Sequence, residues 1–387
     1  SIKAYLAKKS NLTLFLPKMN YFKIIKKSKN SLARLGKIST LHGAVDTPNF
    51  MPIGSRGAVK LLTNKELKNS GAQIILANAY HLFLSPGIKV LKKAKGLHNF
   101  MNWPRAILTD SGGYQVFSLS KWRQISKEGV KFRDINSGQE IFLTPENIVE
   151  FQKNIGSDII MVLDECTPYA SDYLSTKRAV IRTTDWAIRA KKAFRKEEKK
   201  ERRSLLFGII QGGAYSDLRK ISAQSIVDIG FDGYAIGGMM SPLEMKKVLP
   251  PILSILPETA PHYLMGLGNP SQLVWAISRG FDIFDCVLPT RNGRHGFFYV
   301  FKNSKEKFSL KKLLESNFYQ TISIKNSIFK FDQKPIDKNC LCPTCQNYSR
   351  SYLHHLFRIS DPLGQRLAVL HNLHFYFDLF KKIRKSI

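Results

Sequence analysis

Residues 281–295 read FDIFDCVLPTRNGRH, and this stretch indicates both the fold and the chemistry of the chain. An apolar run ends in a carboxylate, Asp285, and a proline-broken loop that carries Arg291 and Arg294 follows it. A carboxylate at the tip of a buried strand is desolvated and held in place, as a nucleophile or an acid–base group must be. Arginines just beyond it suit a polyanion such as RNA. Taken alone, the pattern equally fits a carboxylate that caps the next helix beside a solvated basic loop.

The same arrangement, a short apolar run followed at once by a polar residue or glycine, recurs along the chain. The runs lie at residues 50–53, 73–77, 106–109, 158–163, 205–210, 233–236, 262–265 and 281–284. Directly after runs stand Asp110, Asp164, Gln211, Gly237, Gly238, Gly266 and Asp285. Eight strand-like runs alternating with helix-like segments predict an α/β fold, a closed (β/α)8 TIM barrel, with an open doubly wound sheet as runner-up. Functional groups collected at strand C-termini favour the barrel.

Composition narrows the possible partners. Of the 387 residues 43% are hydrophobic, so the chain can bury a substantial core. Sixty Lys and Arg against 29 Asp and Glu give a net charge of +31, which favours a nucleic acid or an anionic membrane as partner. Base-biased coding is an equally good source of scattered lysine. No apolar run approaches the roughly 18–20 residues of a membrane span, so we expect a cytoplasmic protein without a membrane partner.

Charge, the apolar runs and the clustered cysteines divide the chain into three parts. Residues 1–30 are expected to be a basic, poorly ordered extension, since no Asp or Glu occurs before Asp46. Residues 31–300 would form the barrel with its catalytic and base-binding groups. Residues 301–387 would hold an insertion, a zinc-binding subdomain and closing helices. Within the barrel, residues 190–203 alternate in charge and predict a helix with a solvated face, in preference to an RNA contact.

Three of the five cysteines are clustered, as Cys340, Cys342 and Cys345. Such clustering in a reduced compartment indicates metal rather than disulfides. Three thiolates and one imidazole make the closed tetrahedral site that is typical of structural zinc. The spacing leaves the fourth ligand open among His354, His355 and His371. A site without a position for water predicts a role for Zn²⁺ in folding rather than catalysis.

The segment after the run 106–109 reads DSGGYQVF at residues 110–117. Paired glycines, Gly112 and Gly113, let a ligand approach the backbone closely and leave N–H groups free to point at it. Tyr114 offers an aromatic face on which a base can stack. An ordinary turn with an N-capping aspartate accounts for Asp110 but not for the whole cluster.

Asp164 and Gln211 follow two other runs. An ionised aspartate accepts two hydrogen bonds, whereas a glutamine amide both donates and accepts. The pair therefore suits a guanine edge, which shows adjacent N–H donors beside a carbonyl, and the N–H of Gly238 would be a second donor to that carbonyl. Taken singly, each residue fits a hydrogen-bonded turn equally well.

These motifs, together with DECT at 164–167, GIIQGG at 208–213, DCVLPTR at 285–291 and the cysteine–histidine tail, resemble bacterial-type tRNA-guanine transglycosylases, the queuine tRNA-ribosyltransferase family. The resemblance extends from about Ala33 to Ile387. It implies a (β/α)8 barrel with a zinc subdomain. It also implies exchange of guanine at the anticodon wobble position of tRNA for a 7-deazaguanine, preQ1 or queuine, in queuosine biosynthesis.

The resemblance also assigns roles to residues. Asp285 matches the nucleophile that attacks ribose C1′, and Asp110 matches the acid–base group at purine N9, in a double displacement like that of retaining glycosidases. The residues implied to bind the base are Ser111, Gly112, Gly113, Tyr114, Asp164, Gln211, Gly238, Met239 and Met265, with Tyr114 and Met265 on its two faces. Those implied to contact RNA are Gly266, Leu267, Gly268, Asn269, Pro270, Ser271, Gln272, Thr290, Arg291, Asn292, Gly293 and Arg294. The implied zinc ligands are Cys340, Cys342, Cys345 and His371.

The implied assembly is a homodimer with one structural Zn²⁺ per subunit, which binds a tRNA anticodon loop and a 7-deazaguanine base. A non-catalytic partner subunit of the same superfamily, which keeps the barrel and zinc but lacks the nucleophile, is the alternative, as is an RNA-binding zinc protein. The presence of both Asp110 and Asp285 argues against these alternatives.

The stretch GGMMSPLE at residues 237–244 is shorter than the family pattern, in which a glutamate soon after the glycines helps sense the cationic aminomethyl arm of the incoming base. Here the nearest carboxylate, Glu244, is displaced toward the next helix. We therefore expect normal exchange of guanine but a weaker preference for the aminomethyl base. The alternative is that Glu244 reaches back, or that a backbone carbonyl near Met239 suffices.

Overall fold

The computed structural model describes residues 21–115, 122–134, 138–195, 204–302, 308–315 and 317–387. Of the predicted N-terminal extension, residues 1–20 lie outside the described residues, whereas Phe22–Lys27 forms strand β1. The helix predicted over 190–203 is described as far as Arg195, the last residue of α8.

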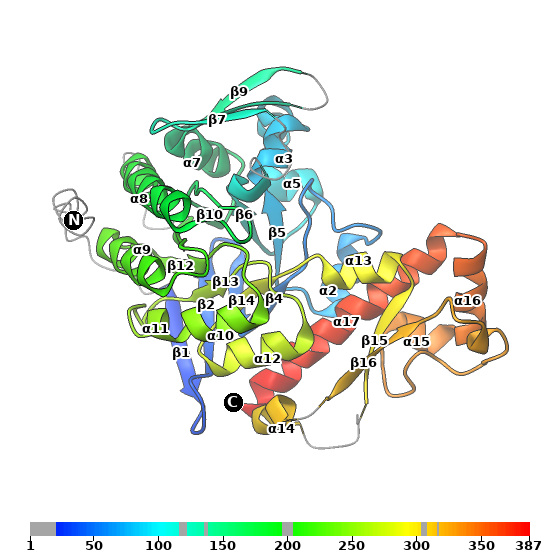
Figure 1. Ribbon diagram of the computed structural model, residues 1–387. Helices are drawn as coiled ribbons and strands as arrows, with labels where there is room; N and C mark the ends of the chain where they lie inside the picture. The colour runs from blue at the N-terminus through cyan, green and yellow to red at the C-terminus, as the bar shows by residue number, and fades with distance from the viewer. Residues whose placement is uncertain (1–20, 116–121, 135–137, 196–203, 303–307, 316) are drawn as a thin grey trace.

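An eight-stranded parallel sheet forms the centre of the molecule (Figure 1). Its strands are β4 (Asn49–Met51), β5 (Ile74–Asn78), β6 (Ala106–Asp110), β10 (Ile159–Met161), β11 (Leu205–Ile210), β12 (Gly233–Ile236), β13 (His262–Leu264) and β14 (Ile283–Asp285). Each of the eight predicted runs contains or overlaps one of them. The sheet order is β4-β14-β13-β12-β11-β10-β6-β5, and a parallel bridge between Ile53 and Leu76 joins the two ends. The closed barrel is therefore confirmed, and the open doubly wound sheet is wrong.

Helices connect consecutive strands and cover the outside of the barrel. They are α2 (Asn64–Ser70), α3 (Ala79–Leu84), α4 (Ile88–Lys93), α5 (Leu97–Met101), α7 (Pro145–Asn154), α8 (Tyr173–Arg195), α9 (Ser216–Ile229), α10 (Pro242–Val248), α11 (Pro250–Leu253) and α12 (Pro270–Ser278). The strands are buried on both faces because side chains fill the barrel inside and helices cover it outside. Among the helices that the structure describes, none is long and apolar enough to span a membrane.

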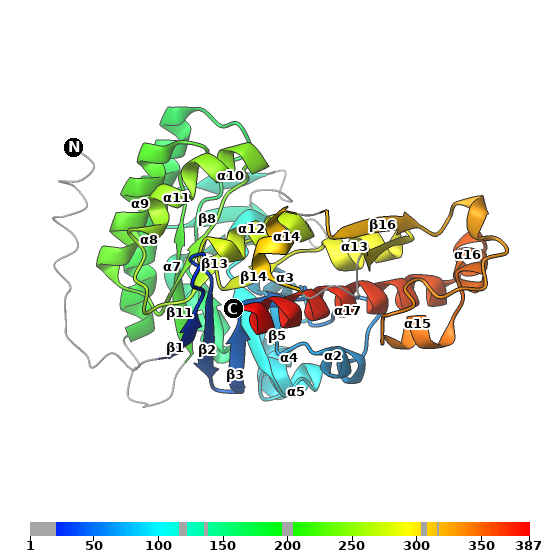
Figure 2. The same ribbon diagram turned by 90° about the horizontal axis from the view of Figure 1, so that it is seen from below.

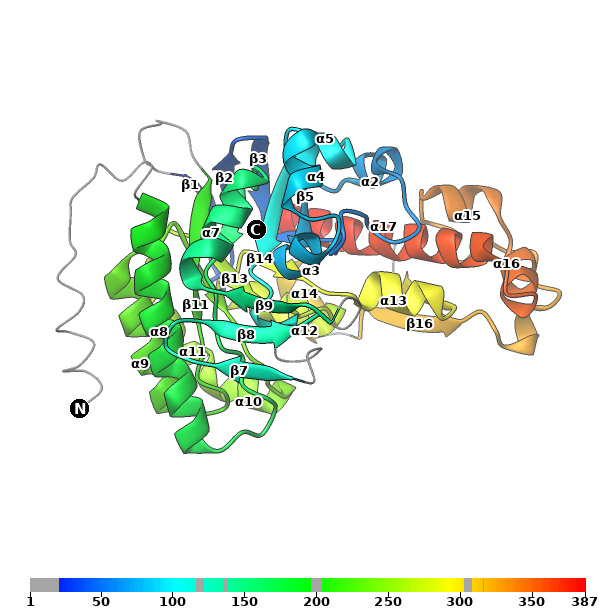
Figure 3. The same cartoon turned by 90° about the horizontal axis from the view of Figure 1, so that it is seen from above.

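Two small antiparallel sheets flank the barrel. Strands β1, β2 (Arg34–Thr40) and β3 (Gly43–Thr47) lie at the N-terminal ends of the barrel strands, where Arg34 forms a buried ion pair with Asp282 just before β14. Strands β7 (Arg123–Ile125), β8 (Val130–Arg133) and β9 (Glu140–Leu143) form a separate layer, at the top of Figure 1 and in the middle of Figure 3. Strands β1–β3 thus cover the N-terminal ends of the barrel strands, and the opposite, C-terminal ends are available for a site.

The C-terminal part extends from the barrel and returns to it (Figure 2). Its elements are α13 (Leu288–Arg294), β15 (Phe297–Phe301), α14 (Leu310–Glu315), β16 (Tyr319–Ser323), the 3-10 helix η1 (Ser327–Phe329), α15 (Pro343–Asn347), α16 (Arg350–Arg358) and α17 (Pro362–Ser386). Helix α17 packs on the barrel, with the ring of Tyr376 4.8 Å from that of Phe50 on β4 and the ring of Phe380 5.8 Å from that of Phe284 on β14. It supplies the outer helix that the last strand requires.

The prediction of a loop after Asp285 is wrong, because Leu288–Arg294 form helix α13. Pro289 lies in its first turn, where the missing N–H has no intrahelical partner to lose and the fixed φ suits a helix. Gly293 lets α13 pack closely on α17, since a Cβ there would lie 2.9 Å from the backbone nitrogen of Val369. Proline, which breaks a helix when it lies in the interior, is therefore compatible with the first turn of α13.

Candidate active site

A pocket of about 470 Å³ lies at the C-terminal ends of the barrel strands. The predicted site residues that line it are Asp110, Tyr114, Asp164, Gln211, Gly238, Met239, Met265, Gly266, Leu267 and Asp285. Those outside the lining are Ser111, Gly112, Gly113, Gly268, Asn269, Pro270, Ser271, Gln272, Thr290, Arg291, Asn292, Gly293 and Arg294. The strand-end rule therefore brings residues far apart in the sequence into one concave site.

Asp285 is buried at the end of β14, and two hydrogen-bond donors hold one oxygen of its carboxylate. The Tyr263 hydroxyl donates to Oδ1 at 2.6 Å, and the Gly266 N–H donates to the same oxygen at 2.7 Å. Burial raises the pKa of Asp285, whereas these two hydrogen bonds act in the opposite direction. Since both donors occupy Oδ1, the carboxylate is fixed in place and Oδ2 is the oxygen available for a reaction.

Asp110 is buried at the end of β6, next to the strand that carries Asn78. The Asn78 side-chain amide donates to Asp110 Oδ2 at 2.9 Å. Burial raises the pKa of Asp110 to about 7, and the charges of Asp164 and Asp285 add to the effect. Near neutral pH this carboxyl group therefore exists in both protonation states, as an acid–base group requires.

Asp164 and Gln211 contact each other in the pocket lining. The Gln211 side-chain amide donates to Asp164 Oδ2 at 2.6 Å, and the Ser222 hydroxyl accepts from the Gln211 backbone N–H at 3.1 Å. Burial raises the pKa of Asp164 to about 6, opposed by the hydrogen bond from Gln211. Within the described part of the chain, neither Gln211 Oε1 nor the buried Ser111 hydroxyl has a hydrogen-bond partner. Buried polar atoms of this kind indicate a site built for a polar ligand.

The glycines of the 110–117 segment are explained by close packing. A Cβ on Gly112, whose φ is +89°, would lie 2.3 Å from the Cβ of Tyr80. A Cβ on Gly113 would lie 2.4 Å from Asp164 Oδ1. Gly112 therefore lets the turn pack on Tyr80, and Gly113 lets it approach the Asp164 carboxylate; neither glycine belongs to the pocket lining.

The two predicted stacking residues stand at the pocket with different exposure. Tyr114 is 46% exposed, and Met265 is half-buried against the barrel core. Both line the pocket, from the ends of different strands. Their side chains are thus available to a planar ligand that enters between them.

The segments predicted to contact RNA divide into packing and exposed residues. Asn269 caps α12 by accepting from the N–H groups of Ser271 and Gln272, and Thr290 is buried in α13. Arg291 is exposed and Arg294 half-buried on α13, the helix that begins directly after the pocket residue Val287. Only part of each predicted segment therefore offers side chains to a large partner.

Sequence reasoning missed two residues that hold the carboxylates. Asn78 follows its run directly, so the strand-end rule that selected Asp110 selects Asn78 as well. Tyr263 lies inside β13 and points its hydroxyl at Asp285, and no local pattern distinguishes it from a core tyrosine. The first omission was avoidable, and the second required the structure.

Glu244 lies on helix α10 and outside the pocket lining. Its carboxylate accepts from the backbone N–H of Ser241 at 2.6 Å, and the Ser241 hydroxyl accepts from the Glu244 N–H at 3.3 Å. This capping box ties the carboxylate to the start of its own helix. The side of the pocket nearest to it is lined instead by Met239, Met240 and Met245.

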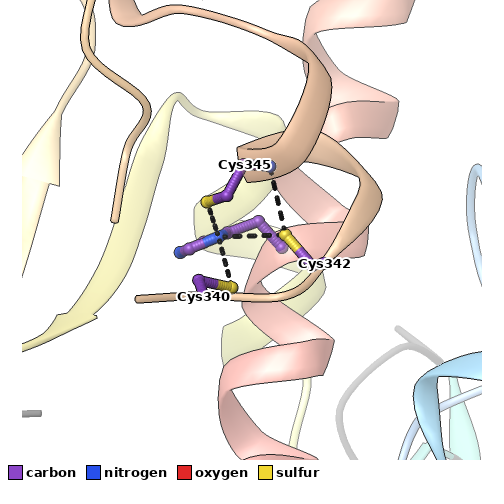
Figure 4. A group of neighbouring side chains, drawn as sticks. Cys340, Cys342 and Cys345 are labelled. Carbon is purple, nitrogen blue, oxygen red and sulfur yellow. Dashed lines mark hydrogen bonds between the residues drawn. The ribbon is translucent and has the colours of Figure 1, made fainter. Parts of the chain in front are cut away.

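A candidate metal centre lies in the C-terminal part (Figure 4). It consists of Cys340, Cys342, Cys345 and His371, whose donor atoms lie within 4.8 Å of one another. The three sulfurs are 3.8, 3.5 and 3.2 Å from Nδ1 of His371. Nε2 of His371 donates to the carbonyl of Tyr299 at 2.7 Å, which leaves the Nδ1 lone pair facing the thiols. The cluster can hold a metal ion.

The other two histidines that the spacing left open lie elsewhere. Nδ1 of the buried His354 contacts the carbonyl of Ile324 at 2.8 Å, and His355 is exposed on the same helix. Neither belongs to the cluster of donor atoms. His371 is therefore the histidine that the fold brings to the cysteines.

Comparison with known proteins finds similarity to one family along most of the chain. A family model described as "Queuine tRNA-ribosyltransferase" matches residues 28–387. A curated protein of that name from Thermoanaerobacter sp. (strain X514) is 47% identical over 370 residues, which cover 95% of this chain and 93% of that protein. Proteins of the same name from Halothermothrix orenii and Listeria innocua serovar 6a are 46% and 47% identical over 369 residues, which cover 95% of this chain and 93% and 92% of the relatives.

Proposed function

This chain belongs to the queuine tRNA-ribosyltransferase family, and from that premise we propose how its pocket performs the reaction. The activity is that of a tRNA-guanine transglycosylase, a pentosyltransferase of queuosine biosynthesis, which exchanges guanine in tRNA for a 7-deazaguanine base. The proposal concerns the residues. Asp285 is the nucleophile, Asp110 is the acid–base group, and Asp164, Gln211 and Gly238 hold the base.

In the first step Oδ2 of Asp285 attacks C1′ of the ribose. The C1′–N9 bond breaks, its electron pair goes to N9 of guanine, and a covalent ribosyl–aspartate forms. The hydrogen bonds from Tyr263 and Gly266 to Oδ1 support this role, because they favour the ionised carboxylate and fix its direction. An anticodon loop is single-stranded, so presenting its base costs little.

Asp110 moves the proton that this exchange requires. In its protonated form it neutralises N9 of the departing guanine, and as the carboxylate it then takes the N9 proton of the incoming base. That base attacks C1′ and releases Asp285, so two displacements at one carbon give net retention. A pKa of about 7 supports both tasks at neutral pH.

Asp164 accepts hydrogen bonds from the adjacent N–H donors of guanine, and Gln211 and the Gly238 N–H donate to its 6-oxo group. Met239 completes the lining of the base site, with Tyr114 and Met265 on the two faces of the ring. Ser111, Gly112 and Gly113 stand directly behind that lining, where Gly113 lets the turn approach Asp164. The partnerless Ser111 hydroxyl and Gln211 Oε1 support a polar ligand here.

The observation that carries the proposal is the pairing of two differently tuned carboxylates in one pocket. Burial raises the pKa of both groups, but two hydrogen-bond donors oppose the rise at Asp285, whereas the charges of acidic neighbours add to the rise at Asp110 and bring its pKa to about 7. Environments that separate two carboxyl groups in this way are typical of a nucleophile and an acid–base group. A partner subunit or a plain RNA-binding protein has no use for the arrangement.

The test is incorporation of radiolabelled guanine into unmodified tRNA with a GUN anticodon. The unaltered protein should incorporate the labelled guanine, whereas the Asp285→Ala variant should not. Both proteins should bind the tRNA. Absence of incorporation by the unaltered protein, with tRNA binding intact, would favour the non-catalytic partner subunit.

We propose further that the metal is one structural Zn²⁺ per subunit. Zn–S bonds of about 2.3 Å and Zn–N bonds of about 2.0–2.1 Å place sulfur and nitrogen about 3.5 Å apart in a tetrahedron. The distances of 3.2–3.8 Å between the cysteine sulfurs and His371 fit this geometry. Four protein ligands leave no position for water, so the ion holds the C-terminal part together.

The RNA site would comprise residues 266–272 and 290–294, with Arg291 and Arg294 beside the nucleotides that flank the target. Exposure of Arg291 and partial exposure of Arg294 support this assignment. Family resemblance supports a cytoplasmic homodimer that binds an anticodon loop with one subunit.

A further inference from the structure

Arg219 on helix α9 is a fully buried cation that the reaction scheme above does not use. Its side chain is 0% exposed, and burial lowers the pKa of the guanidinium to about 10, so the group is positively charged at neutral pH. Among the residues that the structure describes, no carboxylate forms an ion pair with it. Burying a charge without an opposite charge is costly, so the hydrogen bonds of the guanidinium must compensate for the lost hydration.

The guanidinium donates to the backbone behind the base site. Nε donates to the carbonyl of Gly213 at 2.9 Å, and Nη1 donates to the carbonyls of Ile210 at 3.1 Å and Gly237 at 2.7 Å. Nη2 lies 3.4 Å from the sulfur of Met240. Arg219 thus ties together the ends of β11 and β12, where Gln211 and Gly238 face the pocket.

The contact with Gly237 acts on a peptide group that reaches the pocket. The carbonyl of Gly237 and the N–H of Gly238 belong to one planar trans unit and point in opposite directions. Because Arg219 occupies the carbonyl end, the N–H end points away from it, and no described residue accepts a hydrogen bond from it. A charge-assisted hydrogen bond at one end of a peptide group strengthens the donor at the other end.

Two glycines make this arrangement possible. A Cβ on Gly238, whose φ is +95°, would lie 2.9 Å from Arg219 Nη2 and from Gln211 Oε1. A Cβ on Gly237 would lie 2.6 Å from Gln211 Nε2. The guanidinium, the peptide group and the glutamine amide are therefore packed directly against one another.

We propose that Arg219 is a positioning residue that fixes and polarises the Gly238 N–H as the donor to the 6-oxo group of the purine. The inference rests on the proposed function. When the C1′–N9 bond breaks, its electron pair spreads from N9 over the ring to O6 until Asp110 supplies the proton. The polarised donor stabilises the charge on O6 at that moment, in the manner of an oxyanion hole.

The experiment compares guanine with 6-thioguanine, which keeps the N1–H and the 2-amino group but presents a poor acceptor at position 6. Binding of each base to the full chain is measured by titration calorimetry for the unaltered protein, Arg219→Gln and Arg219→Lys. Lys220→Gln, which removes an exposed charge from the same helix, is the matched control and should change neither affinity.

We expect the unaltered protein to prefer guanine. Arg219→Gln should weaken guanine binding roughly ten- to hundredfold and 6-thioguanine binding far less, so that the preference collapses. Arg219→Lys keeps the charge but not the fork of donors, so its preference for guanine should lie between those of the unaltered protein and Arg219→Gln. If Arg219→Gln does not fold, the comparison is made with Arg219→Lys alone. Equal weakening of both bases in either variant would make Arg219 a structural clamp only and would overturn the inference. Failure of the unaltered protein to bind guanine would overturn the proposed function together with it.

Discussion

Replacing Asp110 by asparagine should stabilise the folded protein at alkaline pH while abolishing exchange. The pKa of this carboxyl group is raised from 3.8 to about 7 in the fold, so the folded chain binds the proton more tightly than the unfolded chain. By linkage, stability falls as pH rises through this interval and is constant above it. The amide introduced by Asp110→Asn would keep an acceptor oxygen for the Asn78 side chain and would carry no charge at any pH.

The size of the effect follows from the shift. Ionised Asp110 costs about 4 kcal/mol above pH 7, and about 2 kcal/mol of that cost is present already at pH 5.5. The advantage of Asp110→Asn over the unaltered protein should therefore grow by about 2 kcal/mol between pH 5.5 and pH 8.5. Exchange should be lost at both values because an amide carries no proton to N9.

The assay is urea denaturation at fixed zinc concentration, at pH 5.5 and pH 8.5. Asp228→Asn, at an exposed position on α9, is the matched control and should show no such growth. An Asp110→Asn variant whose advantage stays constant with pH, or which is less stable than the parent at pH 8.5, would refute the electrostatic reasoning. Retained exchange would remove Asp110 from the reaction.

Three further outcomes are expected. Cys342→Ser should lower the metal content from one ion per chain to none and destabilise the C-terminal part, measured by elemental analysis and thermal denaturation; a metal-free, fully stable variant would contradict the structural role. The KM for guanine should rise below about pH 6, as Asp164 takes up a proton and loses an acceptor site, and a KM flat down to pH 5 would contradict this. The Michaelis constants for guanine and the aminomethyl base should show no strong preference for the latter, and Glu244→Gln should change their ratio little; a strong preference lost in that variant, by roughly ten- to hundredfold, would show that Glu244 senses the arm.

Much of the barrel could be predicted because its strands are buried on both faces. Such strands appear in the sequence as short apolar runs, and the polar residue after each run marks the edge of the sheet that carries the site. Asp110, Asp164, Gln211 and Asp285 were identified in this way, and Asn78 follows the same rule. The cysteine spacing likewise indicates a metal cluster but leaves its histidine open; the family resemblance implies His371, and the fold brings His371 to the cysteines.

The remaining features depend on contacts between distant segments. The raised pKa of Asp110 comes first from burial and then from the charges of Asp164, which follows β10, and Asp285, which ends β14; no local pattern reveals these neighbours. Arg219 resembles any arginine on an amphipathic helix until its carbonyl partners are known. Helix α13 was mistaken for a loop because the sequence does not show that Pro289 stands in a first turn.

The central claim is that Asp285 bonds to ribose C1′ during exchange. It is tested most directly by mixing the protein with unmodified tRNA, quenching in denaturant, digesting with trypsin and mapping the RNA-linked peptide by mass spectrometry. The account predicts an adduct on the peptide 280–291, at Asp285 and not at Asp282, which is paired with Arg34 at the opposite end of the barrel. It also predicts no adduct with Asp285→Ala while tRNA binding persists. An adduct mapped to Asp110, or one that survives in Asp285→Ala, would contradict the account.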